Sequence, residues 1–177
     1  MTREEIVTLV DDANRVAGST ERSEMRTRGL PHRATYILVF NGRGEVFVQQ
    51  RTLTKDLYPG YLDPCTGGVV LAGENYEESA ARELAEELGI SGTLLTAHFD
   101  VEYRGEGNHV WGRVFSCTWD GPVTLQPEEV ADGFWLAPEE VLAQAADEPF
   151  TPDSLEVLRR FLLERARPTP APPPLGG

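Results

Sequence analysis

The segment between residues 67 and 90, GGVVLAGENYEESAARELAEELGI, constrains the fold of this chain more than any other part. Asn75 followed by Glu78 is typical of a capping box, in which two side chains close the amino end of a helix. A run of strong helix formers follows, and Gly89 is placed to end the helix as a cap. We therefore predict a glycine-rich loop that leads into a helix over residues 76–88.

The two faces of this predicted helix differ in chemistry. The apolar face consists of Ala80, Ala81, Leu84 and Leu88. The acidic stripe, at i, i+3 and i+4, consists of Glu83, Glu86 and Glu87. Because like charges at this spacing repel, one interpretation is simply a solvated acidic face. The other is a site for a hard divalent cation, since the preceding loop can turn backbone carbonyls towards the carboxylates and Mg²⁺ prefers oxygen ligands.

The same segment resembles the Nudix box, whose pattern is G-x5-E-x7-R-E-U-x-E-E-x-G-U, with U a bulky aliphatic residue. Its defined positions are all matched, by Gly68, Glu74, Arg82, Glu83, Leu84, Glu86, Glu87, Gly89 and Ile90. The resemblance implies that Mg²⁺ or Mn²⁺ is bound by Glu83, Glu86, Glu87 and the carbonyl of Gly67. It also implies a structural role for four other box residues, which are Gly68, Glu74, Arg82 and Gly89. Of these, Glu74 and Arg82 would orient the carboxylates through salt bridges.

Composition narrows the class of partner. The 177 residues are most simply one domain with short flanking pieces, and a 40% hydrophobic content can supply a core. A net charge of −13 argues against a nucleic-acid polymer, because phosphate backbones need a basic footprint. It leaves a small phosphorylated substrate open, since metal ions can bridge two anions. The two cysteines, Cys65 and Cys117, do not suggest a disulfide framework.

The sequence also carries expectations about location and assembly. Its apolar runs are short, and the amino-terminal residues lack a basic region followed by a long apolar segment. We therefore expect no membrane partner and a cytoplasmic protein. A homodimer is a further expectation, because many relatives in the superfamily pair.

Local patterns predict an order of elements around the central helix. We expect an amino-terminal hairpin over residues 5–17, and a short helix over 19–29 that is capped by Ser19 or Thr20 and ends at Gly29. Strands are expected at residues 34–40, 45–51, 92–104, 109–119, 123–126 and 133–136, with a hairpin turn at Asn41-Gly42. Helices are expected at residues 138–146 and 152–166.

This order fits an α/β (α+β) chain. The resemblance implies the Nudix fold, an α/β/α sandwich around a mixed sheet, with an added amino-terminal hairpin and short helix. We expect the hairpin and helix to occupy residues 1–30 and to pack on the domain. The hydrolase domain then spans residues 31–167, and a proline-rich tail spans 168–177.

Candidate site residues outside the box include two cations. Arg51 and Lys55 precede Pro59-Gly60, and cations beside an acidic metal site suit phosphate oxygens, although two surface charges are the plain alternative. The spacing R-x3-K-x3-PG resembles the isopentenyl-diphosphate isomerase branch of the superfamily, which implies that both residues hold a diphosphate. Glu129, in an acidic pair with Glu128, is our candidate for an auxiliary metal ligand or general base.

Other segments extend this resemblance to bacterial Nudix hydrolases of the isomerase-like branch that keep a complete box. They are LPHRATYILVFN at residues 30–41, WLAPEE at 135–140 and FTPDSL at 150–155. True isomerase chemistry would need a cysteine at Gly67, a histidine at Val69 and acids near Gly107 and His109. Cys65 lies two residues from the required place and suits packing better. His32, which matches a metal-binding histidine of the isomerase, then has a structural role.

The leading prediction is a Mg²⁺- or Mn²⁺-dependent hydrolase that cleaves the diphosphate linkage of a small molecule, a nucleoside diphosphate joined to another group. Two alternatives belong to other classes. One is an isomerase of prenyl diphosphates, and the other is a non-catalytic nucleotide-binding module.

Overall fold

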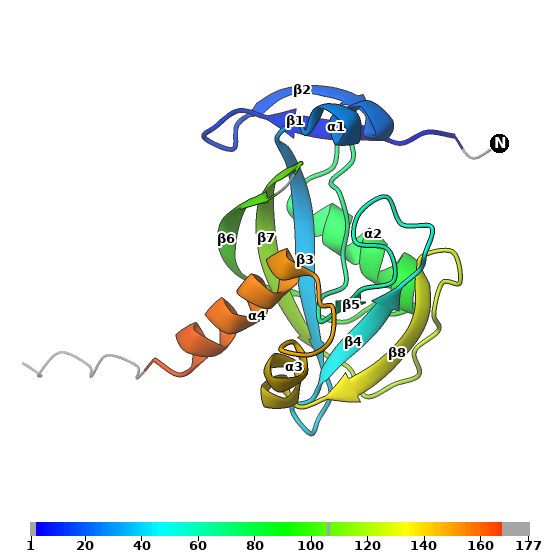
Figure 1. The fold of residues 1–177 in the computed structure, drawn as a ribbon, viewed down its shortest axis with the longest axis vertical. Coiled ribbons are helices and arrows are strands. Elements are labelled where there is room, and N and C mark those ends of the chain that lie inside the picture. Colours follow the sequence, from blue (N-terminus) through cyan, green and yellow to red (C-terminus); the bar gives the residue numbers. More distant parts are fainter. Residues whose placement is uncertain (1–2, 106, 168–177) are drawn as a thin grey trace, which may run out of the picture.

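The computed structural model describes residues 3–105 and 107–167 of the chain (Figure 1). Its strands are β1 (Ile6–Val10), β2 (Val16–Glu21), β3 (His32–Phe40), β4 (Val46–Arg51), β5 (Leu62–Asp63), β6 (Thr96–Gly105), β7 (Asn108–Thr118) and β8 (Val130–Leu136). Its helices are α1 (Arg22–Arg28), α2 (Tyr76–Leu88), α3 (Pro138–Gln144) and α4 (Pro152–Arg165). The proline-rich tail predicted at residues 168–177 lies outside the described residues.

Strand β3 organises a mixed sheet. It runs parallel to β7 along its whole length, and β6 pairs antiparallel with β7. By contrast, β3 meets β4 only at Phe40 and Val46, so the two strands splay apart beyond that point. The loop that precedes α2 fills the gap, because the amides of Thr35 and Ile37 donate to the carbonyls of Gly68 at 2.9 Å and Thr66 at 2.7 Å. The box loop is thereby fixed to the centre of the sheet.

Alternation along β3 divides the core into two layers. Ile37 and Val39 pack in the cluster that includes Leu84 and Leu88 of α2. Their neighbours Tyr36, Leu38 and Phe40 point to the other face and pack in the cluster that includes residues of α3 and α4. This is the period-two pattern of a strand buried on both sides. The predicted α/β/α sandwich around a mixed sheet is confirmed.

The amino-terminal hairpin and α1 lie across one end of β3 (Figure 1). Val7 and Met25 are buried against Val69 of the box loop. The prediction that a helix begins at Ser19 or Thr20 is wrong, because both residues continue β2 in register with β1. Helix α1 begins at Arg22, and it ends, as predicted, at Gly29 in the left-handed conformation with φ 61°.

Two other local predictions are corrected. Residues 123–126 form no strand. Instead, the amides of Thr124 and Gln126 donate to the carbonyls of Leu88 and Glu87 at 3.0 Å, which satisfies the free carboxyl end of α2. The β3–β4 hairpin is present, but its turn spans residues 41–45 and its left-handed residue is Gly44, with φ 77°, rather than Gly42.

The apolar face predicted for α2 is mostly buried, with one exchange. Ala81 is exposed, whereas Glu87 is only 4% exposed. The helix therefore turns one of its acidic residues into the protein. Among the described residues, none of the helices combines the length and the apolar character that crossing a membrane requires.

Candidate active site

Helix α2 is fixed at both ends, which places its acidic residues. The side chain of Asn75 accepts from the amide of Glu78 at 2.8 Å, and the carboxylate of Glu78 accepts from the amide of Asn75 at 3.4 Å. This confirms the predicted capping box. The predicted stop is also confirmed, since Gly89 is left-handed with φ 65°. Glu83, Glu86 and Glu87 therefore belong to the last two turns.

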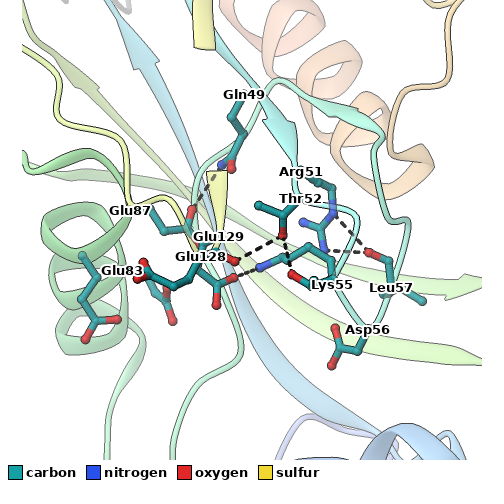
Figure 2. Close-up of polar contacts among 12 residues, drawn as sticks. Gln49, Arg51, Thr52, Lys55, Asp56, Leu57, Glu83, Glu87, Glu128 and Glu129 are labelled. Atoms are coloured by element: carbon teal, nitrogen blue, oxygen red, sulfur yellow. Dashed lines mark hydrogen bonds and ion pairs between the residues drawn. The ribbon is translucent and has the colours of Figure 1, made fainter. Parts of the chain in front are cut away.

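Glu87 is the most enclosed of the three acidic residues. Figure 2 shows its side chain directed from α2 towards Gln49 of β4, whose Nε2 donates to Oε2 of Glu87 at 3.2 Å. Burial raises the pKa of Glu87 to about 8, and the negative charge of Glu83 acts in the same direction. A nearby cation would stabilise the charged form of a carboxylate in this position.

Arg82 holds the other two box glutamates. Its guanidinium binds Glu74 through two contacts of 2.7 and 2.9 Å, and Nη1 lies 3.0 Å from Oε1 of Glu83 and 3.2 Å from Oε2 of Glu86. Burial raises the pKa of Glu83, while the positive charge of Arg82 opposes this shift. The expected salt bridge between Arg82 and Glu74 is thus present, and it anchors a network that positions Glu83 and Glu86.

The glycines at the start of the box meet neighbours that exclude a side chain. At Gly68, a Cβ atom would lie 2.5 Å from Oε1 of Glu83. At Gly67, with φ 150°, a Cβ atom would overlap the carbonyl oxygen of Thr35 on β3. The close approach of backbone to sheet therefore requires glycine at position 67, whereas a side chain at position 68 would displace the carboxylate of Glu83.

A cavity of about 110 Å³ lies between the box loop, α2, the residue before β1, the start of α1 and the loops before β5 and β8. Its walls are Glu5, Arg22, Lys55, Gly67, Gly68, Glu83, Glu86, Glu87, Gln126 and Glu129. Each residue that the sequence predicts as a metal ligand borders this cavity. The structure thus brings the box glutamates, Lys55 and Glu129 to one place, and Arg51 lies just behind it in an adjoining cavity.

The wall fits a hard divalent cation by its chemistry, because carboxylate oxygens and the glycine backbone dominate it. The side chains are not gathered into a finished ligand set. Within residues 3–105 and 107–167, no three His, Cys, Asp or Glu side chains are arranged to hold one ion. Glu83 and Glu86 are instead engaged with Nη1 of Arg82.

The two candidate phosphate-binding cations already have partners. Lys55 forms an ion pair with Glu129, the candidate base, so these two predicted residues contact one another (Figure 2). Arg51 donates to the carbonyl of Leu57 at 2.8 and 3.2 Å, and it lies 3.5 Å from Asp63. Arg51 therefore also fixes the conformation of the loop at residues 52–61 and its junction with β5.

Sequence reasoning missed four residues that border or support the cavity: Glu5, Arg22 and Gln126 line it, and Gln49 contacts Glu87. Gln49 directly follows the apolar residues 46–48 of β4 and is buried like them. A polar residue at the end of such an apolar run was a signal in the sequence that its amide needs a buried partner, which is Glu87. Arg22 comes from α1, and its place beside the box depends on how the amino-terminal unit packs. Gln126 borders the cavity and belongs to residues 123–126, the segment wrongly expected to be a strand.

Comparisons with known proteins agree with this geometry. The NUDIX domain family model matches residues 30–161. A relative from Yersinia pestis is 48% identical over 158 residues, covering 89% of this chain and 86% of the relative. The protein YfcD of Escherichia coli is 45% identical over 163 residues, covering 92% and 89%. Both are called uncharacterized Nudix hydrolases.

A solved structure supports the same conclusion. The crystal structure of DR0079 from Deinococcus radiodurans superposes with a TM-score of 0.79 at 29% identity, and the match covers 88% of this chain and 98% of that protein. Together with a loop and helix whose glutamates border one cavity, the family match and these likenesses establish that the chain belongs to the Nudix family of hydrolases, which act on phosphorus-containing acid anhydrides.

Proposed function

We propose that this chain is a Mg²⁺- or Mn²⁺-dependent hydrolase that cleaves the diphosphate linkage of a nucleoside diphosphate joined to another group. The supporting observation is the division of charge around one cavity. Glu83, Glu86 and Glu87 supply oxygen ligands on one side, and Lys55 supplies a cation on the other. An anionic substrate bridged by a divalent cation fits between two such walls.

The metal would be held by Glu83, Glu86, Glu87 and the carbonyl of Gly67. When bound, a divalent cation there would neutralise charge on the phosphates and lower the pKa of an attacking water. Arg82 would keep Glu83 and Glu86 in place through its contacts of 3.0 and 3.2 Å. Gln49 would fix the orientation of Glu87.

The chain's own groups then account for substrate binding and proton transfer. A phosphate oxygen of the substrate would take Lys55 away from Glu129, and Arg51 would face the more distant phosphate. The freed carboxylate of Glu129 would accept a proton from the attacking water. The water oxygen bonds to phosphorus, the bridging P–O bond breaks, and the bridging oxygen keeps the electron pair. The products are two phosphate monoesters.

We further propose that the chain belongs to the isomerase-like branch of the family without isomerase activity. Arg51 and Lys55 both border the cavity that adjoins the box, as the R-x3-K-x3-PG resemblance implies. Carbon protonation needs an acid at the position of Gly67, which has no side chain. Cys65 does not replace it, because the thiol is buried and burial raises its pKa.

A panel of diphosphate compounds tests the proposal when it is assayed with Mg²⁺ and Mn²⁺ at mildly alkaline pH, reading released nucleotide and phosphate. We expect Glu87→Gln to lower kcat by about a hundredfold or more, since it removes a charge from the reacting centre. The matched control is Glu139→Gln, which changes an exposed glutamate of α3. Both variants should keep the circular dichroism spectrum of the wild type.

The outcomes separate the candidate functions. Near-normal hydrolysis by Glu87→Gln would contradict the assignment of the box. Binding of diphosphates without hydrolysis by the wild type would favour a nucleotide-binding module, and conversion of isopentenyl diphosphate to its allylic isomer would favour an isomerase.

A further inference from the structure

A second cavity, of about 80 Å³, adjoins the one beside the box. The two share Arg22, Lys55, Gly67 and Gly68 as wall residues. The second cavity extends from this common wall towards the amino end of α4 and the start of β7. A polar cavity needs roughly 10–15 Å³ to hold one water molecule, so this one has room for a small multi-atom group.

Within residues 3–105 and 107–167, two buried polar atoms on the wall of this second cavity have no hydrogen-bond partner. Thr151 is 1% exposed and Asn108 is 4% exposed, and both line the cavity. Neither Oγ1 of Thr151 nor Oδ1 of Asn108 makes a hydrogen bond within the described part of the chain. Thr151 occupies the N-cap position of α4, yet its side chain caps nothing. Buried polar atoms without partners are rare, because desolvation without a new hydrogen bond is unfavourable.

The second cavity is lined by charged groups of both signs and by neutral polar groups. Lys55 lies on the wall shared with the cavity beside the box, and Arg51, 3.5 Å from Asp63, lines only the second cavity; both cations suit phosphate oxygens. Asn108 and Thr151 present an amide oxygen and a hydroxyl on the part nearest β7 and α4. An amide oxygen needs a donor, and a hydroxyl can donate or accept, so an alcohol group matches both.

We propose that the second cavity is the subsite for a hydroxyl-bearing arm of the substrate, a sugar or polyol attached to the diphosphate. The arm enters past Lys55, its phosphate lies near Arg51, and its hydroxyls pair with Asn108 and Thr151. This inference rests on the proposed diphosphate hydrolysis and names the group on the far side of the scissile bond.

The hydroxyl of Thr151 has no structural duty that would explain its presence. Valine has nearly the same shape, and replacing an unpartnered buried hydroxyl by an apolar group removes an unfavourable desolvation. Solvent filling the cavity is the competing explanation, because water could also satisfy both atoms. The two explanations differ in whether the hydroxyl affects one class of substrate selectively.

Thr151→Val tests the subsite with substrates that differ only in the arm. UDP-glucose, ADP-ribose and CDP-glycerol carry hydroxyl-bearing arms, and UDP, ADP and CDP lack them. We expect Thr151→Val to raise KM for the best arm-bearing substrate about tenfold, the effect of one lost hydrogen bond, while KM for its arm-less partner stays within about twofold. Thr151→Ser, which keeps the hydroxyl, should behave as the wild type.

Ser79→Ala is the matched control, since Oγ of Ser79 is also buried without a partner but borders neither cavity. It should change neither KM. Asn108→Ala provides an independent measurement if Thr151→Val fails to fold, with the same expected selectivity. Equal effects of Thr151→Val on both substrates, or no effect, would show that the cavity holds only solvent.

The panel also separates this inference from the function on which it rests. Wild-type enzyme that hydrolyses UDP, ADP or CDP but none of the arm-bearing compounds would overturn the subsite and leave the hydrolase intact. Wild-type enzyme that hydrolyses no diphosphate would overturn both.

Discussion

Glu87 and His32 show at the scale of single residues how burial selects a neutral form. Glu87 is 4% exposed and its pKa is raised to about 8, whereas His32 is 2% exposed and its pKa is lowered to about 4. Burial disfavours the charged form of each group, so a carboxyl and an imidazole shift in opposite directions. Glu87 faces the cavity in which the proposed divalent cation would bind. Nδ1 of His32 donates to the carbonyl oxygen of Leu30 at 2.9 Å, and the positive charges of Arg26 and Arg22 further oppose protonation of the ring.

The low pKa of His32 predicts a loss of stability in acid. The pKa of His32 in the folded state lies below the ordinary value of 6.5. Between pH 6.5 and about 4, the unfolded chain therefore binds a proton at His32 that the native protein does not bind. Stability from His32 is complete above pH 6.5 and is lost as the pH falls towards 4. Between pH 7.5 and 5.5 we expect the free energy of unfolding of wild type, relative to His32→Gln, to fall by about 1.4 kcal/mol.

Urea unfolding at several pH values measures this difference, and effects of other titrating groups cancel in the subtraction. His98→Gln is the control, because His98 is exposed and should shift the pH profile much less. A wild-type profile parallel to that of His32→Gln would show that the pKa of His32 is the same in the folded protein as in the unfolded chain.

At the scale of elements, the box loop acts as an additional partner of β3. Its backbone pairs with Thr35 and Ile37 in the gap left by the splayed β4, which brings Gly67 and Gly68 between the sheet and α2. Substitutions of the two glycines should therefore affect different properties of the protein. At Gly67 a side chain meets rigid backbone, whereas at Gly68 it meets the flexible end of Glu83.

We therefore predict that Gly67→Ala mainly lowers stability and that Gly68→Ala mainly lowers activity. Gly67→Ala should reduce the free energy of unfolding by about 2 kcal/mol or more, through a strained φ and a backbone overlap. Gly68→Ala should displace the carboxylate of Glu83 and reduce kcat roughly tenfold or more, with a small change in unfolding. Thermal unfolding and kinetics of both variants test this, and a reversed ranking would refute the placement of the loop.

The sequence predicted those elements whose signals are local. The helix from Tyr76 to Leu88 was predicted with both ends, because its capping box and its terminal glycine lie within the segment itself. The start of α1 was not, since Ser19 and Thr20 are good caps locally but are claimed by pairing with β1. Residues 123–126 look like a strand and instead satisfy the end of α2, a contact across a long sequence separation.

The same difference between local and long-range signals applies to the residues of the candidate site. The box glutamates could be named because their spacing is fixed by one helix. The pairing of Lys55 with Glu129 could not, because it depends on how two loops far apart in sequence are folded. The buried amide of Gln49 and the empty hydrogen-bonding capacity of Thr151 likewise become visible only when the layers are assembled.

At the scale of the whole molecule, the cavity beside the box is built from parts with different origins. The family match begins at residue 30, yet Glu5 and Arg22 of the amino-terminal unit border the cavity. Arg22 forms ion pairs with Glu5 at 2.8 Å and with Asp56 at 3.0 Å, so the unit is held to the 52–61 loop by charge. The packing of Val7 and Met25 on Val69 adds an apolar contact. Together these contacts place the amino-terminal unit against the site.

The central claim is that Glu83, Glu86 and Glu87 hold the divalent cation that hydrolysis requires. A crystal of the protein soaked in Mn²⁺, measured for anomalous scattering, tests it most directly. We predict a peak bounded by these three carboxylates and the carbonyl of Gly67, absent in crystals of Glu87→Gln under the same conditions. A peak confined to another part of the molecule, with the three side chains unmoved and Arg82 still bound to Glu83 and Glu86, would contradict the claim.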